Sequence, residues 1–164
     1  MLRVALTGGI ATGKSYVLAR LGERGVPTID SDAIVHELFE PHTEVTHAIA
    51  LEFGAATLRD DGRVDRAMLA SRVFSDDSVR LRLEAIVHPI VYEKIRQWFA
   101  VPGRPLGVAS IPLLYETRRE RDFDAVIVTA CGADQQLERI MARGLSEKDA
   151  RLRMAAQMPA GEKA

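Results

Sequence analysis

The sequence predicts an α/β fold in which a mainly parallel β-sheet is flanked by helices. Short apolar runs alternate with segments of helical periodicity along the 164-residue chain, which is the pattern of successive βα units. Two of the runs, 106–110 and 125–129, are almost continuously apolar, as strands buried on both faces of a parallel sheet are. A glycine-rich segment, 8–15, directly follows the first apolar run. Together these observations favour one α/β domain with a glycine-rich turn after its first strand.

The first half of the chain is predicted to contain two strands and four helices. In chain order these are a strand at 2–6, a helix at 16–24, a strand at 26–29, a helix that ends at 39, and helices at 43–53 and 65–74. Gly25, Pro41 and Gly54 end three of the helical patterns. Ser31 or Asp32 is expected to cap the helix after the second strand, because either side chain can accept a backbone N–H.

The second half opens with a long helical pattern over 76–99. The apolar positions predicted to form its buried stripe are Leu81, Ala85, Ile86, Ile90 and Ile95. Pro89 falls inside this pattern and should kink the helix or split it in two, since proline lacks a backbone N–H. The remaining predicted elements are strands at 106–110 and 125–129 and helices at 133–143 and 146–158, the last capped by Ser146.

Composition limits the classes of protein that the chain can belong to. A hydrophobic content of 47% with 27% charged residues is typical of a water-soluble globular protein, and no apolar run reaches the roughly 20 residues of a membrane span. The net charge of −1 provides no general field for nucleic acid or an anionic membrane. Cys131 is the single cysteine and is interpreted as a small buried apolar residue. We therefore expect a cytoplasmic protein, monomeric or weakly homo-oligomeric, without nucleic-acid or membrane partners.

The glycine-rich turn carries a complete G-x-x-x-x-G-K-S phosphate-binding motif. Its residues are Gly8, Gly9, Ile10, Ala11, Thr12, Gly13, Lys14 and Ser15, followed by Tyr16 at the start of the next predicted helix. Between a strand and a helix, consecutive backbone N–H groups and the positive end of the helix dipole converge on a polyphosphate. Lys14 would bridge the β- and γ-phosphates, and the Ser15 hydroxyl would ligate Mg²⁺. A nucleoside triphosphate such as ATP is the predicted ligand, and a glycine-rich turn with a chance lysine is the alternative.

The acidic residues after the second strand favour a phosphotransferase among the proteins that carry this motif. A GTPase should show N-K-x-D after a strand, but the segment after 125–129 reads Ala-Cys-Gly-Ala. Asp30 and Asp32 follow the second strand, where a carboxylate can accept the proton of an attacking hydroxyl. Either of the two could instead be a helix N-cap.

A longer series of motifs resembles the dephospho-CoA kinase family, and it extends over essentially the whole chain. The matching segments, in order, are 7–15, 29–32, 52–54, 62–69, 73–74, 83–89, 112–116, then Gln136, Arg139, Arg143 and 156–159. The His-Pro pair at 88–89 and the Pro-Leu-Leu-x-Glu run at 112–116 are the most specific of these. We interpret residues 1–164 as a single domain of this family.

The resemblance implies transfer of phosphate from ATP to the 3′-hydroxyl of the ribose of dephospho-coenzyme A, the last step of coenzyme A synthesis. It implies a phosphate-loop core with a five-stranded parallel sheet, a helical acceptor-binding insertion at about 33–103, and a mobile lid. Residues 11–16 would hold the ATP phosphates. By the same resemblance, Asp32 would be the base or the orienting residue at the acceptor hydroxyl. The remaining acceptor-side residues would be Asp30, Arg66, His88 and Pro89.

Arg143, between the last two predicted helices, would be the lid arginine that reaches the transferring phosphoryl group. Simpler interpretations remain for several of these residues. His88 could cap a broken helix, and Arg66, Arg143 and Gln157 could be solvated surface residues.

Two departures from the family pattern bear on activity. The family commonly carries an acidic residue two positions before the proline of Pro-Leu-Leu-x-Glu, where this chain has Ser110. The family also continues beyond residues 157–163 with a strand and a closing helix, which this sequence does not contain. The alternatives to a dephospho-CoA kinase are therefore a truncated nucleotide-binding protein of low activity, or another small-molecule kinase of the nucleoside or shikimate type.

Overall fold

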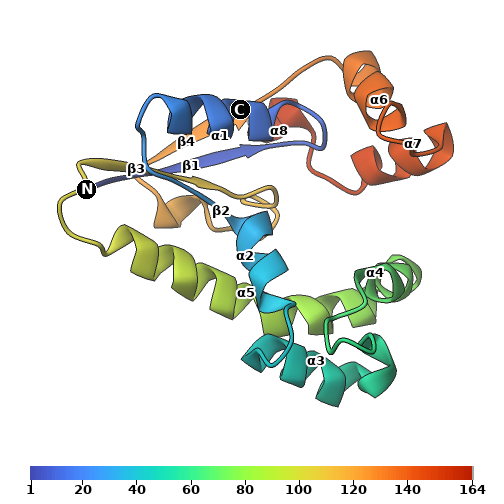
Figure 1. Ribbon diagram of the computed structural model, residues 1–164. Helices are drawn as coiled ribbons and strands as arrows, with labels where there is room; N and C mark the ends of the chain where they lie inside the picture. Colours follow the sequence, from blue (N-terminus) through green and yellow to red (C-terminus); the bar gives the residue numbers. More distant parts are fainter. Residues whose placement is uncertain (164) are drawn as a thin grey trace. The chain divides into compact units, whose positions relative to one another are not determined.

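A computed structural model describes residues 1–163, apart from the side chains at positions 74, 75 and 160. The last residue of the predicted 1–164 domain and the Phe74 side chain therefore lie outside the described residues. The chain divides into two compact units, one formed by 1–31 with 99–163 and the other by 32–98 (Figure 1).

The first unit contains a parallel sheet of four strands in the described chain. These are β1 (Leu2–Gly8), β2 (Thr28–Asp30), β3 (Leu106–Ser110) and β4 (Ala125–Thr129), in the order β2-β3-β1-β4. The register pairs Leu6 with Ser110, and Asp30 with Ser110. The carboxyl ends of β1, β2 and β3 therefore meet at one edge of the sheet, which is where open α/β sheets bind ligands.

The two apolar runs of the second half form strands with the predicted bounds, and the predicted parallel α/β fold is confirmed. The expectation that both runs are buried is wrong for β4, in which Ala125 is exposed and Ile127 is 41% exposed. Within residues 1–163, β4 pairs only with β1 and forms an edge of the sheet. The described residues thus form four of the five strands implied by the family resemblance.

The helices of the first unit are α1 (Lys14–Glu23), α6 (Ala133–Met141), α7 (Glu147–Ala155) and the short α8 (Ala160–Lys163), with a 3₁₀ turn at Glu120–Asp122. Helix α1 covers one face of the sheet, where its apolar side chains pack on Val4, Leu6 and Val108 (Figure 1). Helices α6 and α7 form a hairpin (Figure 1). Ser146 caps α7 as predicted, because its Oγ accepts the Asp149 N–H at 3.1 Å.

The second unit is helical, with α2 (Ser31–Leu38), α3 (Glu44–Phe53), a 3₁₀ turn at Ala55–Thr57, α4 (Arg66–Ser75) and α5 (Asp77–Phe99). Thr43 caps α3 by accepting the Thr46 N–H, and Asp65 caps α4 by accepting the N–H groups of Ala67 and Met68. Helix α2 begins at Ser31. Ser31 and Asp32 therefore lie in its first turn and do not precede it as the expected caps.

Helix α5 differs from prediction in two respects. It continues across Pro89 without being split, because one missing N–H leaves the other hydrogen bonds of a 23-residue helix in place. Its buried stripe is Val87, Val91, Ile95 and Phe99, whereas Leu81 is 58% exposed. Of the predicted stripe only Ile95 is fully buried. Ile86 and Ile90 form one apolar row along this helix, and Val87 and Val91 form a second row one position further on. Packing against the rest of the protein buries the second row.

Candidate active site

The phosphate-binding motif forms the turn between β1 and α1, as the sequence predicts. Gly13 has a φ of 102°, a left-handed value that suits glycine, and is the N-cap of α1. No side chain caps this helix end, and its first turn contains no acidic residue. The backbone N–H groups and the positive end of the α1 dipole are therefore left to bind an anion.

The loop is closely packed against the end of β4. A Cβ atom at Gly8 would collide with the Thr129 side chain and lie 2.7 Å from Thr12 Oγ1. Thr12 is buried, and its hydroxyl bonds to Gly9 O and to Thr129 Oγ1, both at 2.8 Å. Ala11 also has a left-handed backbone, with a φ of 60°. The contacts of Thr12 and the close fit at Gly8 therefore define the backbone conformation of the loop.

Lys14 contacts Ser110, the residue that replaces the acidic residue expected from the family pattern. The Lys14 ammonium donates to Ser110 Oγ at 2.9 Å, and Ser110 is completely buried at the end of β3. Asp30 ends β2 in register with Ser110. The structure thus brings the lysine of the loop and the strand ends of β2 and β3 to the same edge of the sheet. Ser15 and Tyr16, the next residues of α1, are exposed.

The proposed acceptor residues other than Asp30 belong to the helical unit. Asp32 is exposed in the first turn of α2. Arg66, the first residue of α4, hydrogen-bonds through its guanidinium to His36 Nδ1 of α2 at 3.1 Å. His36 was not among the predicted site residues, because a lone exposed histidine on a helix carries no local signal.

His88 and Pro89 lie in the middle of α5. The His88 ring is half-buried and packs edge-on against Tyr92, with ring centroids 6.2 Å apart. The alternative in which His88 caps a broken helix is wrong, because α5 is continuous at this position.

The α6–α7 hairpin contacts the phosphate loop near its base and carries Arg143 in its turn. Gln136 and Arg139 of α6 donate to the carbonyl oxygens of Ile10 and Ala11, at 2.7 and 3.2 Å. Gln157, which follows α7, accepts the Ile10 N–H at 2.7 Å. The surface interpretation of Gln157 is therefore wrong. Arg143 is exposed.

The residues present suit Mg²⁺ only as an ion held mainly by the nucleotide. Residues 1–163 contain no group of three or more His, Cys, Asp or Glu side chains that could enclose a metal ion. The exposed Ser15 hydroxyl at the start of α1 provides one neutral oxygen beside the phosphate loop. Mg²⁺ commonly takes few protein ligands together with phosphate oxygens and waters, so this donor set fits.

Among the described residues, no helix is both long enough and apolar enough to cross a membrane.

The fold and the loop define the class of the protein as a phosphate-loop kinase, in which a parallel sheet presents a phosphate-binding turn after β1 and an acidic residue after β2. A family model described as dephospho-CoA kinase matches residues 2–164. The chain belongs to the dephospho-CoA kinase family, as the sequence motifs indicated.

Individual proteins support this assignment. A dephospho-CoA kinase from Anaeromyxobacter dehalogenans is 47% identical, and the alignment covers 98% of this chain and 78% of that protein. The crystal structure of TT1252 from Thermus thermophilus matches with a TM-score of 0.86 and 35% identity, covering 99% of this chain and 83% of that one. A dephospho-CoA kinase structure from Campylobacter jejuni matches with a TM-score of 0.67 and 27% identity, covering 98% of this chain and 82% of that one.

Proposed function

We propose that this chain transfers the γ-phosphoryl group of ATP to the 3′-hydroxyl of the ribose of dephospho-coenzyme A, producing coenzyme A and ADP. One observation carries the proposal. The phosphate loop presents an uncapped helix N-terminus and Lys14 at the carboxyl edge of the sheet, in a chain that matches the dephospho-CoA kinase family from residue 2 onward. That match also disfavours a nucleoside or shikimate kinase.

The donor side of the site is residues 8–16. The N–H groups at the start of α1 would bind the phosphates, and Lys14 would leave Ser110 to contact the β- and γ-phosphates. Ser15 would hold Mg²⁺ together with phosphate oxygens. When bound, this ion neutralises charge on the transferring group.

The acceptor side is assigned to Asp32, Asp30, Arg66, His88 and Pro89. The acceptor 3′-oxygen forms a bond to the γ-phosphorus while the bond to the ADP oxygen breaks, and Asp32 takes the hydroxyl proton. Arg66 would provide positive charge for the acceptor, with its guanidinium positioned by His36. The compact unit 32–98 supports an acceptor-binding role for the insertion predicted at about 33–103.

Arg143 is assigned to the transferring phosphoryl group. Its exposed position in the turn of the α6–α7 hairpin supports this role, because an arginine on a lid must reach a ligand from outside the loop. We further propose a cytoplasmic monomer or weak homo-oligomer, in keeping with the single cysteine and the small net charge of the sequence.

The decisive experiment is product formation from dephospho-coenzyme A and Mg·ATP, resolved by mass. We expect a product heavier by one phosphate, and no comparable product from adenosine or shikimate under the same conditions. A folded protein that binds ATP but phosphorylates none of these acceptors would contradict the proposal.

A further inference from the structure

We infer that Gln136 and Gln157 are positioning residues for donor binding, because their amides hold both polar groups of the Ile10 backbone in the phosphate loop. Gln157 Oε1 accepts the Ile10 N–H, and Gln136 Nε2 donates to the Ile10 carbonyl, each at 2.7 Å. The inference rests on the proposed function of the loop in binding the phosphates of ATP.

The two contacts are complementary and define the orientation of one residue. An acceptor opposite the N–H and a donor opposite the carbonyl fix both peptide groups that flank the Ile10 Cα atom. The Ile10 N–H is directed to Gln157 and is thereby occupied. The Thr12 N–H donates to the Gly9 carbonyl at 3.3 Å. We assign the N–H groups at 13–16 to the phosphates, which divides the loop into an anchored first half and a ligand-binding second half.

The anchoring explains how Ala11 keeps a left-handed backbone. A φ of 60° is unfavourable for a residue with a Cβ atom, so neighbouring contacts must maintain it. Ile10 is held on one side by the two glutamines, and Thr12 is held on the other by Thr129. Arg139 adds a fourth contact, to the Ala11 carbonyl. The conformation therefore depends on side chains from α6, from β4 and from the segment after α7.

The missing side chain at Gly9 leaves the space next to the loop that the two glutamine amides occupy. A Cβ atom at Gly9 would lie 2.9 Å from Gln136 Nε2 and 3.6 Å from Gln157 Oε1. Ile10 and Ala11 also pack against Ile140 of α6 and Ala150 of α7 in one apolar cluster. The glutamine contacts are thus the polar part of a closely packed interface between the loop and the hairpin.

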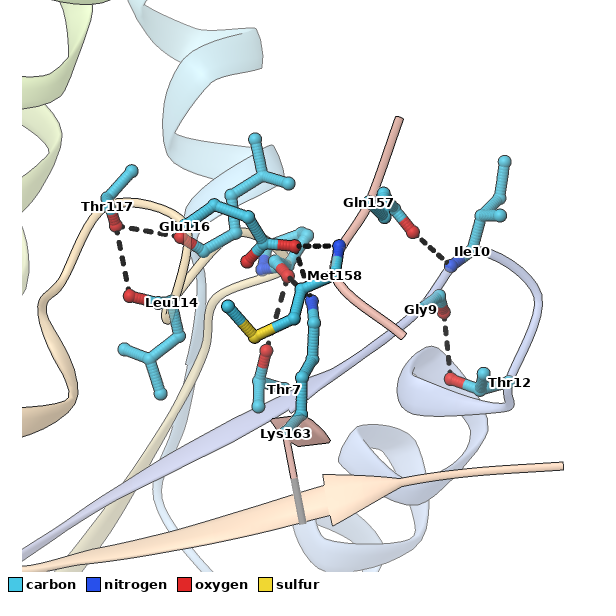
Figure 2. Close-up of polar contacts among 12 residues, drawn as sticks. Thr7, Gly9, Ile10, Thr12, Leu114, Glu116, Thr117, Gln157, Met158 and Lys163 are labelled. Atoms are coloured by element: carbon cyan, nitrogen blue, oxygen red, sulfur yellow. Dashed lines mark hydrogen bonds and ion pairs between the residues drawn. The ribbon is translucent and has the colours of Figure 1, made fainter. Parts of the chain in front are cut away.

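The residue after Gln157 is held in place by an ion pair between Glu116 and the buried Lys163. The N–H of the next residue, Met158, donates to Glu116 Oε1 at 3.0 Å, and the same oxygen lies 2.7 Å from Lys163 Nζ. The Lys163 side chain is completely buried, and its ammonium also donates to Pro112 O at 3.3 Å. Figure 2 shows these contacts in sequence from Glu116 through Met158 and Gln157 to Ile10. The loop after β3 therefore supports the phosphate loop through the segment that carries Gln157.

The test compares Gln157→Met and Gln136→Met with the matched control Gln135→Met. Gln135 is an exposed neighbour on α6 whose side chain makes no polar contact with the described residues. Methionine keeps the length of glutamine but removes its amide. Binding of tripolyphosphate and of ADP would be measured by calorimetry, and exchange of the Ile10 amide proton by NMR. Neither measurement requires an acceptor substrate.

We expect each of the two variants to raise the dissociation constant for tripolyphosphate roughly three- to tenfold, the effect of losing one hydrogen bond, with the control within twofold of the wild type. Ile10 amide exchange should accelerate in Gln157→Met. The double variant should lose less affinity than the product of the single losses, because both side chains support one conformation.

Unchanged tripolyphosphate affinity in both folded variants would overturn the inference, as would losses that multiply independently. A wild-type protein that binds tripolyphosphate but makes no coenzyme A would instead contradict only the proposed function. A lower melting temperature with unchanged affinity of the folded protein would show that the glutamines support the fold alone.

Discussion

The phosphate loop and the acceptor-side residues are held by different means. Thr12 bonds to Thr129, and Ile10 bonds to Gln136 and Gln157, so each contact joins parts of the chain more than 100 positions apart. Asp32 and Arg66, by contrast, are exposed near the starts of α2 and α4. The proposed donor side is thus built into the packing of the sheet unit, whereas the side chains proposed for the acceptor side lie on helix surfaces. Substitutions on the acceptor side should therefore affect chemistry alone, and those under the loop should affect stability as well.

The largest expected effect tests the acceptor side of this comparison. Asp32→Asn should lower kcat by roughly 10²–10⁴, because the amide cannot accept the hydroxyl proton. The affinity for ATP and the melting temperature should change little, since Asp32 is exposed. Steady-state kinetics and calorimetry would measure the three quantities, with the exposed Asp60→Asn as a control. A variant that retains near-wild-type kcat would remove Asp32 from the catalytic role.

The second prediction tests the donor side. Gly8→Ala should lower the free energy of unfolding by about 1–3 kcal/mol, because its Cβ atom would collide with Thr129 beneath the loop. ATP affinity should fall with it, since the loop must shift to relieve the collision. Denaturant unfolding would measure the change against Gly132→Ala, where a Cβ atom meets nothing within 4 Å. Equal stability of the two variants would contradict the proposed packing.

The third prediction sharpens the description of the donor side at Ser110. Ser110→Asp places a carboxylate next to Lys14, which now donates to a neutral hydroxyl. Pairing with the new charge should weaken metal-free ADP binding several-fold and make the rate depend more steeply on Mg²⁺.

ADP calorimetry with and without Mg²⁺, together with a Mg²⁺ titration of the rate, would check this prediction. An unchanged rate with an unchanged Mg²⁺ dependence would show that Ser110 does not influence the metal requirement. Ser110→Ala is the matched control, because it removes the hydroxyl without adding charge.

The smallest effect concerns an ion pair at the start of β1, away from the site. Hydrogen bonds from Arg3 lower the pKa of Asp124 from 3.8 to about 2. The pair therefore stabilises the fold fully above pH 4, and this contribution is lost as the pH falls through about 2. The stability difference between wild type and Asp124→Asn, measured by urea unfolding, should shrink between pH 5 and pH 2. A stability difference that stays constant from pH 5 to pH 2 would show that the ion pair does not cause it.

The sequence predicted correctly those features of the fold that depend only on a short segment of the chain. The bounds of β3 and β4 and the Ser146 cap were confirmed because a short segment decides each of them. The buried row of α5 was predicted incorrectly, since Ile86 and Val87 are both apolar and only packing selects between them. The edge position of β4 also depends on strand order, which its own sequence does not encode.

The candidate site was predictable to a similar extent. The phosphate motif predicted its own turn, whereas Asp30, predicted to follow a strand at 26–29, is the last residue of β2 at Thr28–Asp30. The contacts of Gln136 and Gln157 with Ile10 span 126 and 147 positions and carry no local pattern. The partner of Lys14 likewise became evident only when the register placed Ser110 at the end of β3.

The buried pair of Glu116 and Lys163 has a consequence for how the protein matures during synthesis. The phosphate motif leaves the ribosome well before Gln157 and Lys163, which lie almost 150 positions later in the sequence. A nascent chain that has reached the end of α6 already contains the motif and Gln136, but it lacks Gln157, which accepts the Ile10 N–H, and the lysine that pairs with Glu116. Nucleotide affinity should therefore arise only after Gln157 has emerged, and ATP should stabilise a chain that contains residues 157–163 far more than a shorter nascent chain.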